Sequence, residues 1–406
     1  MTMFNNGCHI TYCTNIHPGE SWEDTFASIK AAVPAVKSKV AKGTSFGIGL
    51  RLSDKASISL LEKDNLPEFK NWLKEHDCYV FTMNGFPFGE FHHQIVKDQV
   101  HHPDWTTPAR FDYTSRLFDI LAVLLPENID GGISTSPLSY KYWEAVREDK
   151  DRIMHEATMH MVKIAEKLYR INQQTKQVLH LDIEPEPDGL LENTDEVIIW
   201  FNDWLMPLGT AYLKQQLDLS SQTAEACLKK HIRLCYDVCH FAIGYEKPEE
   251  VFRLLKTNGI QIGKIQISAA LKVMLPGKLE ERQWVDDALK PFVESTYLHQ
   301  VVERDAEGQI THYPDLPQAL HQLQTTKADE WRIHFHVPVF IQGYGKLAST
   351  QEDIVQVLDY IKNERVTNHL EVETYTWEVL PKGIQLDLVA SIIREMDWVI
   401  NIFSNR

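Results

Sequence analysis

Cysteine is scarce in this chain, which has six cysteines in 406 residues and no C-x-x-C pair. Neither a disulfide framework nor a zinc ribbon is therefore indicated, and reduced thiols in a cytoplasmic protein are the expected state. Long apolar runs are also missing, so we expect no insertion into a membrane. The first residues lack the charged start and the apolar core of a secretory signal. These absences together predict a cytoplasmic location.

The chain also has fewer basic than acidic residues: 41 Lys and Arg against 57 Asp and Glu, which gives a net charge of −16. Proteins that bind nucleic acid usually carry a basic stripe, and no Lys/Arg cluster is visible here. P-loop, H-E-x-x-H and G-x-S-x-G motifs are absent, and "GIGL" (47–50) lacks the third glycine of a dinucleotide site. The remaining partner is a small-molecule metabolite, with the oligomeric state left open.

The chain does contain a regular alternation of short apolar segments and long helical patterns. The segments with the character of β-strands are 9–15, 45–53, 78–84, 132–137, 178–185, 232–240, 264–269 and 370–377. Helical periodicity is found at 21–40, 54–76, 109–125, 151–172, 191–217, 247–258 and 349–363. Strands that alternate with helices predict βαβ units, and eight such units predict a (β/α)8 TIM barrel. A doubly wound open sheet is the alternative.

The longest interruption of this alternation is the segment 271–330, after the seventh predicted strand. It contains a predicted helix at 284–296 and a predicted hairpin at 298–314, with its turn at 305–308. A segment in this position follows the C-terminal end of a barrel strand, where loops shape the active site. We therefore expect one barrel domain over 1–406, with 271–330 as an insertion or lid that covers the C-terminal mouth.

Four consecutive predicted strands end in polar side chains that face the barrel interior. In "VLHLDIEP" (178–185), alternate residues are apolar, so that His180, Asp182 and Glu184 share the other face. The same alternation directs Asp237, Gln266 and Glu373 inward. Glu186 lies past Pro185, and we expect it to leave the barrel for solvent or a loop.

These inward carboxylates require a partner, because burying an unpaired carboxylate costs several kcal/mol. Three carboxylates and one amide oxygen form a set of hard oxygen ligands suited to Mn²⁺, Mg²⁺ or a similar divalent ion. The alternative for each residue is an ordinary buried contact. Lys264, for example, is available to form an ion pair with Asp182 or Glu371.

The motifs "IEPEP", "YDVCHF", "KIQIS" and "EVET" resemble those of the xylose isomerase-like barrel superfamily. That group includes hydroxypyruvate isomerases, ketose 3-epimerases, inosose dehydratases and endonuclease IV-type nucleases. The resemblance implies a divalent metal ion (Mn, Mg, Co or Zn) held by Glu184, Asp237, Gln266 and Glu373. It also implies that His240 contacts the substrate.

A second resemblance covers nearly the whole chain. The segments "HITYCTNIHPGESW", "NGFPFGEFH", "VKDQVHHPDW", "GGISTSPLSYK" and "WRIHFHVPVF" are similar to those of the EboE family of metabolite traffic proteins. This resemblance implies a link to the export of a secondary-metabolite precursor. The chemistry of that family is not settled, so the resemblance leaves catalysis open.

Several further residues are candidates for an additional metal ligand or a substrate contact. His334 and His336 share one face of "RIHFHVPVF", at a place where endonuclease IV-type proteins bind further metal ions. Asn84 and the loop residues His92 and His93 follow the third strand, and His17 and Glu20 follow the first. Backbone-bonded histidines and ordinary loop packing are the alternatives.

Three functions are compatible with this pattern. In the first, a metal-dependent isomerase or epimerase acts on a hydroxy-carbonyl metabolite, with Glu184 and Glu373 exchanging a proton and His240 orienting a hydroxyl. In the second, the barrel binds a metabolite without turning it over. A metal-dependent phosphodiesterase of the endonuclease IV type is the third, and the net negative charge and Gln266 weigh against it.

Overall fold

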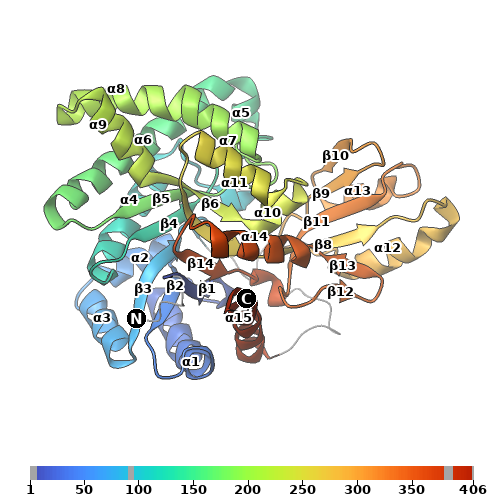
Figure 1. Cartoon of the computed structure of the whole chain (residues 1–406), viewed down its shortest axis with the longest axis horizontal. Coiled ribbons are helices and arrows are strands. Elements are labelled where there is room, and N and C mark those ends of the chain that lie inside the picture. The colour runs from blue at the N-terminus through green and yellow to red at the C-terminus, as the bar shows by residue number, and fades with distance from the viewer. Residues whose placement is uncertain (1–6, 90–95, 379–386, 405–406) are drawn as a thin grey trace.

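A closed ring of parallel strands forms the centre of the protein, whose computed structural model describes residues 7–89, 96–378 and 387–404 (Figure 1). The ring follows the order β1-β14-β7-β6-β5-β4-β3-β2. A parallel bridge between Cys13 and Gly49 brings the two edge strands together. The strands of the ring are β1 (His9–Tyr12), β2 (Phe46–Arg51), β3 (Cys78–Asn84), β4 (Gly131–Thr135), β5 (Leu179–Ile183), β6 (Ile232–Asp237), β7 (Ile262–Ile267) and β14 (His369–Val372). The predicted TIM barrel is therefore confirmed.

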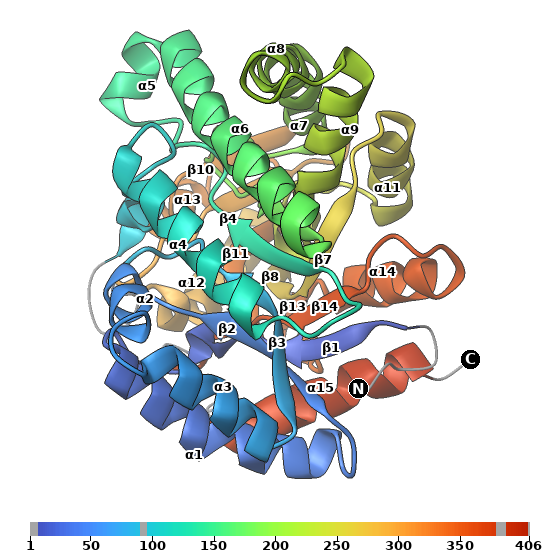
Figure 2. The same ribbon diagram turned by 90° about the vertical axis from the view of Figure 1, so that its left-hand side faces the viewer.

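Helices surround this ring on the outside, as Figure 2 shows. They are α1 (Trp22–Val40), α2 (Asp54–Leu60), α3 (Asn65–Glu75), α4 (Pro108–Leu124), α5 (Glu144–Glu148), α6 (Lys150–Thr175), α7 (Thr194–Trp200), α8 (Met206–Leu217), α9 (Ser221–His231), α10 (Val238–Ile243), α11 (Pro248–Thr257), α14 (Gln351–Asn363) and α15 (Leu388–Ser404). Side-chain caps define several starts, such as Ser21 and Asn193, which accept hydrogen bonds from Asp24 N and Glu196 N. None of the helices in the described ranges is long and apolar enough to cross a lipid bilayer.

The sequence-based boundaries differ from the structure in a few places. The predicted helix 54–76 is two helices, α2 and α3, because the chain turns between them through Lys63 at φ 51°. The predicted strand 232–240 ends at Asp237, whose side chain accepts a hydrogen bond from His240 N and so starts α10. Helices α9 and α15 were not predicted.

A second sheet lies between β7 and β14 in the chain and stands beside the barrel in Figure 1. It is antiparallel, with the order β10-β9-β11-β8-β13-β12. Its strands are β8 (Ala269–Met274), β9 (Val301–Arg304), β10 (Ile310–Tyr313), β11 (Glu330–Val337), β12 (Gly343–Tyr344) and β13 (Leu347–Ser349). The predicted helix and hairpin of 271–330 are present as α12 (Gln283–Leu289) and β9–β10, joined by α13 (Leu316–Gln322) to β11. The sheet extends past both ends of the predicted segment.

The interior of the barrel is polar along its whole length. At mid-depth, Lys264 Nζ lies 2.5 Å from Glu371 Oε2 and donates to Ser134 Oγ, with both charged side chains fully buried. Glycine makes room for this pair, since a Cβ at Gly49 would lie 1.9 Å from Glu371 Oε1. Although burial lowers it, the neighbouring Glu371 raises the pKa of Lys264 above its usual value. Of the two partners foreseen for Lys264, the structure selects Glu371.

Candidate metal centre

Three carboxylates meet at the C-terminal mouth of the barrel. Glu184 follows β5, Asp237 ends β6 and Glu373 follows β14, and all three are buried. One oxygen of each lies within 4.8 Å of the others. Glu184 Oε2 and Asp237 Oδ2 have no hydrogen-bond partner within the described residues. The structure thus brings three of the four predicted ligands together, with two buried oxygens left for a further partner.

The protonation of these carboxylates reflects their mutual repulsion. Burial, then the charges of Glu373 and Asp237, raise the pKa of Glu184 well above its usual value. Burial and the charge of Asp237 do the same to the pKa of Glu373. Burial opposes the ionisation of Asp237, but His240, His336 and the Ser268 hydroxyl hold its pKa below the usual range. A divalent cation bound between these carboxylates would attract all three and offset their mutual repulsion, so this set of oxygen ligands fits such an ion.

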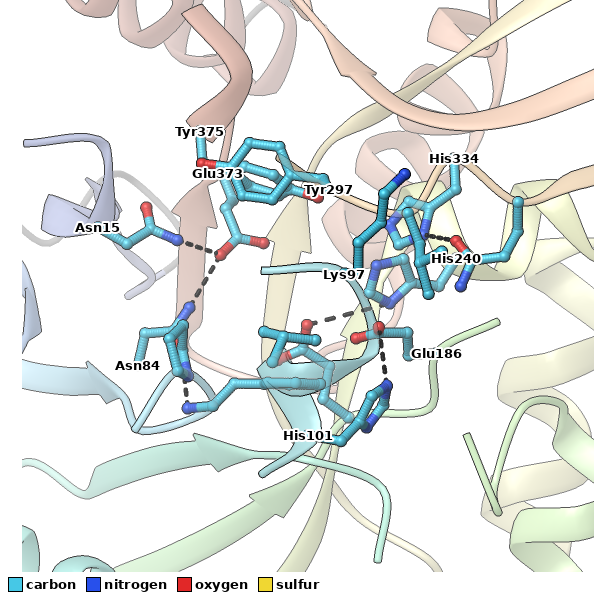
Figure 3. Close-up of a pocket in the computed structure, with 16 residues that line it drawn as sticks. Asn15, Asn84, Lys97, His101, Glu186, His240, Tyr297, His334, Glu373 and Tyr375 are labelled. Carbon is cyan, nitrogen blue, oxygen red and sulfur yellow. Dashed lines mark hydrogen bonds and ion pairs between the residues drawn. The ribbon is translucent and has the colours of Figure 1, made fainter. Parts of the chain in front are cut away.

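Two asparagines hold Glu373 in place. Asn15 Nδ2 and Asn84 Nδ2 each donate to Glu373 Oε1 at 2.8 Å (Figure 3). Outer partners of this kind orient metal ligands. Asn84 was predicted from its position at the end of the third strand. Asn15 was missed because it lies in a short turn after β1, where strand alternation no longer predicts the direction of a side chain.

Gln266 faces the interior as predicted but makes other contacts. Its Oε1 accepts a hydrogen bond from Cys235 Sγ at 2.6 Å. Within the described part of the chain, it makes no hydrogen bond with the three carboxylates. On the same strand side, Ser268 Oγ donates to Asp237 Oδ1 at 2.6 Å. The part of Gln266 as a fourth ligand therefore stays a prediction.

Three histidines, His240, His334 and His336, lie near one another, and two of them, His240 and His336, are close to Asp237. Each uses Nδ1 for a protein contact: His240 with Pro185 O at 2.9 Å, His336 with Glu373 O at 3.1 Å and His334 with Gln300 Oε1 at 2.9 Å. A donor at Nδ1 leaves Nε2 with its lone pair, the arrangement of a metal-binding or substrate-binding imidazole. Burial lowers the pKa of His336 to about 4 and holds that of His334 well below its usual value, so both rings are neutral at pH 7.

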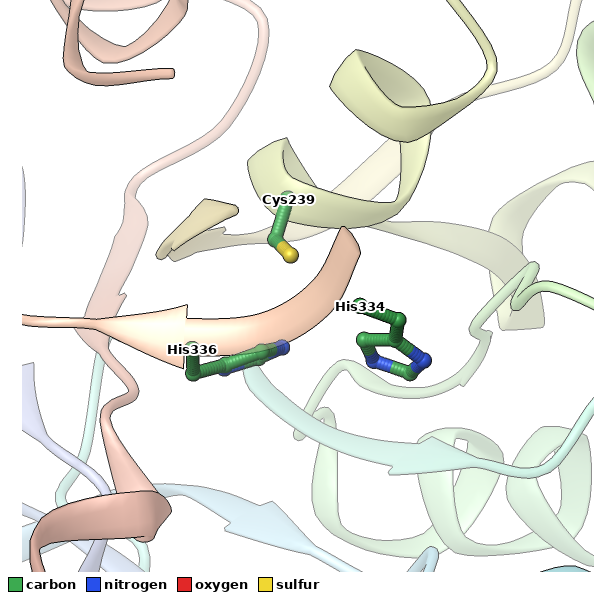
Figure 4. A group of neighbouring side chains, drawn as sticks. All are labelled: Cys239, His334 and His336. Carbon is green, nitrogen blue, oxygen red and sulfur yellow. The ribbon is translucent and has the colours of Figure 1, made fainter. Parts of the chain in front are cut away.

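Two ligand groups include these histidines. The first joins Asp237, His240 and His336, with ligand atoms within 4.8 Å of one another. Cys239, His334 and His336 form the second (Figure 4). Burial raises the pKa of Cys239 well above its usual value, which disfavours the thiolate a metal requires. The group that shares Asp237 with the carboxylates is therefore the stronger candidate for a second ion or a substrate contact.

A cavity of about 60 Å³ opens beside the carboxylates. Its polar lining consists of Asn15, Asn84, Lys97, His101, Glu184, Glu186, His240, Gln300, His334 and Glu373. Glu186 lies in the loop after β5, one of the two places expected for it, but it is buried and not in solvent, and His101 Nε2 lies 3.4 Å from its Oε1. The reason is a turn after β5, in which Glu186 N donates to Leu191 O and folds the loop back over the mouth.

The segment between β8 and β11 supplies one wall of this cavity. Tyr297, Leu298 and Gln300 line it, together with His334 of β11 (Figure 3). His17 does not line the cavity, and its Nε2 lies 3.0 Å from Tyr12 Oη. His92 and His93 lie outside the described residues. The predicted site residues that converge on the cavity are thus Glu184, Glu373, His240, His334 and Asn84, with Asp237 and His336 directly behind them.

Comparisons with known proteins found several solved structures to which this chain is similar. No family model and no curated protein matches the chain. A xylose isomerase-like TIM barrel protein from Mycobacterium smegmatis in complex with magnesium has a TM-score of 0.49 and 10% identity, covering 98% of this chain and 97% of that one. A D-tagatose 3-epimerase-like protein has a TM-score of 0.47 and 10% identity, covering 97% and 96%. The IOLI protein with a binding zinc atom has a TM-score of 0.44 and 11% identity, covering 98% of each chain. At these values the matches record likeness alone, and the barrel assignment rests on the strand order.

Proposed function

We propose that this protein is a divalent-metal-dependent isomerase or epimerase that acts on a small hydroxy-carbonyl metabolite. The observation that carries the proposal is the group of three buried carboxylates, two of whose oxygens have no hydrogen-bond partner within the described residues, next to a cavity lined by polar side chains. Glu184, Asp237 and Glu373 would hold the ion, and Gln266 remains the candidate fourth ligand. The motifs that resemble the xylose isomerase-like superfamily support the same ligand set.

A bound ion would supply polarisation of the substrate carbonyl, which acidifies the neighbouring C–H bond. Glu184 can offer one oxygen to the ion and the other to a proton, since its Oε2 has no hydrogen-bond partner within the described residues. Glu373 Oε1 already accepts hydrogen bonds from Asn15 and Asn84, so its Oε2 would face the ion or the substrate. In this proposal one glutamate acts as the base and the other as the acid. His240 Nε2 is placed to accept a hydrogen bond from a substrate hydroxyl.

The cavity limits the substrate to a small metabolite with polar groups. Ten of its lining side chains are polar, and they include carboxylate, amide, imidazole and ammonium groups. The resemblance to the EboE family supports a metabolite linked to the traffic of a secondary-metabolite precursor. The net charge of −16 disfavours a nucleic-acid substrate.

The second candidate function is a metabolite-binding protein without turnover. It is favoured by the apolar part of the cavity lining, to which Phe86, Pro87, Val100, Tyr297 and Leu298 contribute. A carrier needs shape and affinity but no proton exchange, so the two functions differ in a measurable reaction.

The decisive experiment is proton exchange in D2O. Metal-loaded protein is incubated with a panel of ketoses and other hydroxy-carbonyl compounds, and deuterium uptake at carbon is followed by mass spectrometry. We expect uptake with the wild type, loss with Glu184→Gln, and no change with Glu225→Gln, which alters an exposed glutamate of α9. Binding of a compound without deuterium uptake would support the carrier, and the isomerase proposal would then be abandoned.

A further inference from the structure

A second group of metal-binding side chains lies at the opposite, N-terminal end of the barrel. His180 is near the start of β5, His369 starts β14, and Asp130 immediately precedes β4. Each offers one ligand atom, and these atoms lie within 4.8 Å of one another. In the sheet, β7 and β6 separate β14 from β5, so the histidines approach each other across the barrel interior. None of these residues takes part in the mouth site.

The distances within this group suit an ion better than direct contacts. His180 Nε2 lies 3.6 Å from Asp130 Oδ2, and His369 Nε2 lies 3.4 Å from Asp130 Oδ1. Both exceed the usual length of a hydrogen bond between nitrogen and carboxylate. Ligands at the zinc–nitrogen and zinc–oxygen distances of about 2.0–2.2 Å stand roughly 3.4 Å apart in a tetrahedron. The distance from His369 Nε2 to Asp130 Oδ1 matches that edge, and the three ligand atoms lie within 4.8 Å of one another.

The two imidazoles also lack other partners on the side that faces Asp130. His180 and His369 are both 0% exposed. Their Nε2 atoms have no hydrogen-bond partner in the ranges that the structure covers. His180 Nε2 and His369 Nε2 therefore both face one carboxylate.

His180 has the outer support that metal-binding histidines usually have. Its Nδ1 donates to Asp182 Oδ1 at 2.6 Å, which fixes the ring with Nε2 towards Asp130. Two glycines make room for this pair. A Cβ at Gly132 would lie 2.3 Å from His180 Cε1, and one at Gly263 would lie 1.8 Å from Asp182 Oδ1. Any larger residue on these strands would displace the histidine or its carboxylate.

Asp130 provides access and already binds one cation. Arg233 Nη1 lies 3.2 Å from Asp130 Oδ2, so that Oδ1 is the oxygen left for an ion. Asp130 and Arg233 also line a surface cleft that includes Gln261, Arg365 and Asn368. Through this cleft an ion could enter, and water could complete its coordination.

We propose that Asp130, His180 and His369 form a second metal site, selective for Zn²⁺ or an ion of similar preference. Two imidazole nitrogens and one carboxylate oxygen are a ligand set that zinc favours, in contrast to the oxygen ligands at the mouth. The ion would tie β5 and β14 to the loop before β4. Its effect would be on stability, and the site does not depend on the function proposed for the mouth.

Zinc binding to a protein with a disabled mouth tests this proposal. The background is the variant Glu184→Gln/Glu373→Gln/His336→Asn, freed of metal with a chelator and titrated with Zn²⁺. We expect it to retain about one zinc per chain by mass spectrometry after gel filtration, and to gain thermal stability. Adding His369→Asn should abolish both effects. His231→Asn, which changes another buried histidine, bonded through Nδ1 to Leu179 O, should abolish neither.

Zinc-edge anomalous diffraction from crystals of the wild type provides a test that needs no variant. A peak between Asp130 and the two histidines supports the proposal. Peaks confined to the mouth, or no zinc retained by the background variant, would overturn it. The titration uses a variant whose mouth ligands are altered, so it reports on the second metal site alone. If that site binds no zinc, the isomerase proposal is unaffected, and failure of the isomerase proposal would leave the second metal site unaffected.

Discussion

The two ends of the barrel differ in the chemistry of their polar groups. At the mouth, Glu184, Asp237 and Glu373 offer oxygen ligands, which suit Mg²⁺ or Mn²⁺. At the N-terminal end of the barrel, called the base below, His180 and His369 offer nitrogen ligands beside one carboxylate ligand, Asp130. This ligand set suits zinc. One barrel interior can thus present two different ligand sets, because each strand delivers side chains to both ends.

The ends also differ in how their charges are balanced. At the base, Asp130 lies beside Arg233, and Asp182 accepts a hydrogen bond from His180. At the mouth, three carboxylates gather, and among the described residues Lys264 is the buried cation that acts on Glu184 and Glu373, although it is already paired with Glu371. Such an arrangement costs folding free energy unless an ion is bound, which is typical of a functional site. The comparison therefore supports the two proposals, an active site at the mouth and a stabilising ion at the base.

The largest expected effect comes from removing two mouth ligands. Glu184→Gln/Glu373→Gln should lose the mouth ion, with an affinity decrease beyond the roughly 100-fold that outer partners cause. Because two repelling charges are removed, the metal-free variant should unfold at a higher urea concentration than the metal-free wild type. Mn²⁺ titration followed by electron paramagnetic resonance measures the first effect. Unchanged Mn²⁺ affinity would contradict the ligand assignment.

The next largest expected effect concerns the buried ion pair of Lys264 and Glu371, which lies between the two ends of the barrel. Lys264→Met should destabilise the protein by about 3–5 kcal/mol, because it leaves the buried Glu371 without its partner. Lys264→Met/Glu371→Gln should recover much of that loss, which urea unfolding of the three proteins would show. If the single variant were as stable as the wild type, the interior would be more hydrated than its burial indicates.

Glu395 of α15, which contacts Thr374 next to Glu373, should make the free energy of unfolding depend on pH. Its Oε1 accepts hydrogen bonds from Thr374 Oγ1 at 2.7 Å and Val339 N at 3.1 Å. Burial raises the pKa of Glu395 from 4.5 to about 7, so the folded state binds the proton more tightly than the unfolded state. The stability from this group is complete below pH 4.5 and is lost as the pH rises towards 7. The loss is up to about 3 kcal/mol.

Glu395→Gln isolates this effect, because glutamine keeps the accepting oxygen and cannot ionise. The variant should match the wild type at pH 4.5 and exceed its free energy of unfolding at pH 8, as measured by urea unfolding. Equal pH profiles for the two proteins would show that Glu395 titrates normally.

The smallest expected effect is on the support of Glu373. Asn15→Ala removes one of the two amides that donate to Glu373 Oε1, and should weaken mouth metal binding by about 10–100-fold. Zinc binding at the base should not change, which makes that site the internal control. Equal losses at both ends would indicate a general disruption of the fold.

Strand alternation explains why the sequence predicts the mouth better than the base. Glu184, Asp237 and Glu373 stand at strand ends, so their direction follows from the apolar residues between them. Asp130 lies just before β4, outside the predicted strand 132–137, and no periodic pattern assigns it a direction. His180 was predicted to face inward, but nothing in the sequence pairs it with His369, which it meets across the barrel.

The second sheet was the least predictable part of the fold. Its strands pair across long sequence separations, as when Ala348 of β13 lies beside Lys272 of β8. Hydrophobic alternation indicates a strand but not its partner. The sequence of β11 therefore indicates two histidines on one face, but not the strands with which β11 pairs. Asn15 and the return of Glu186 to the cavity escaped prediction for the same reason, because turns determine both.

The central claim is a metal ion held by Glu184, Asp237 and Glu373, and anomalous diffraction from crystals soaked in Mn²⁺ tests it most directly. We expect a manganese peak among these three carboxylates in the wild type and none there in Glu184→Gln/Glu373→Gln. A wild-type map with no manganese at the mouth would contradict the account, and the metal-dependent isomerase would have to be abandoned.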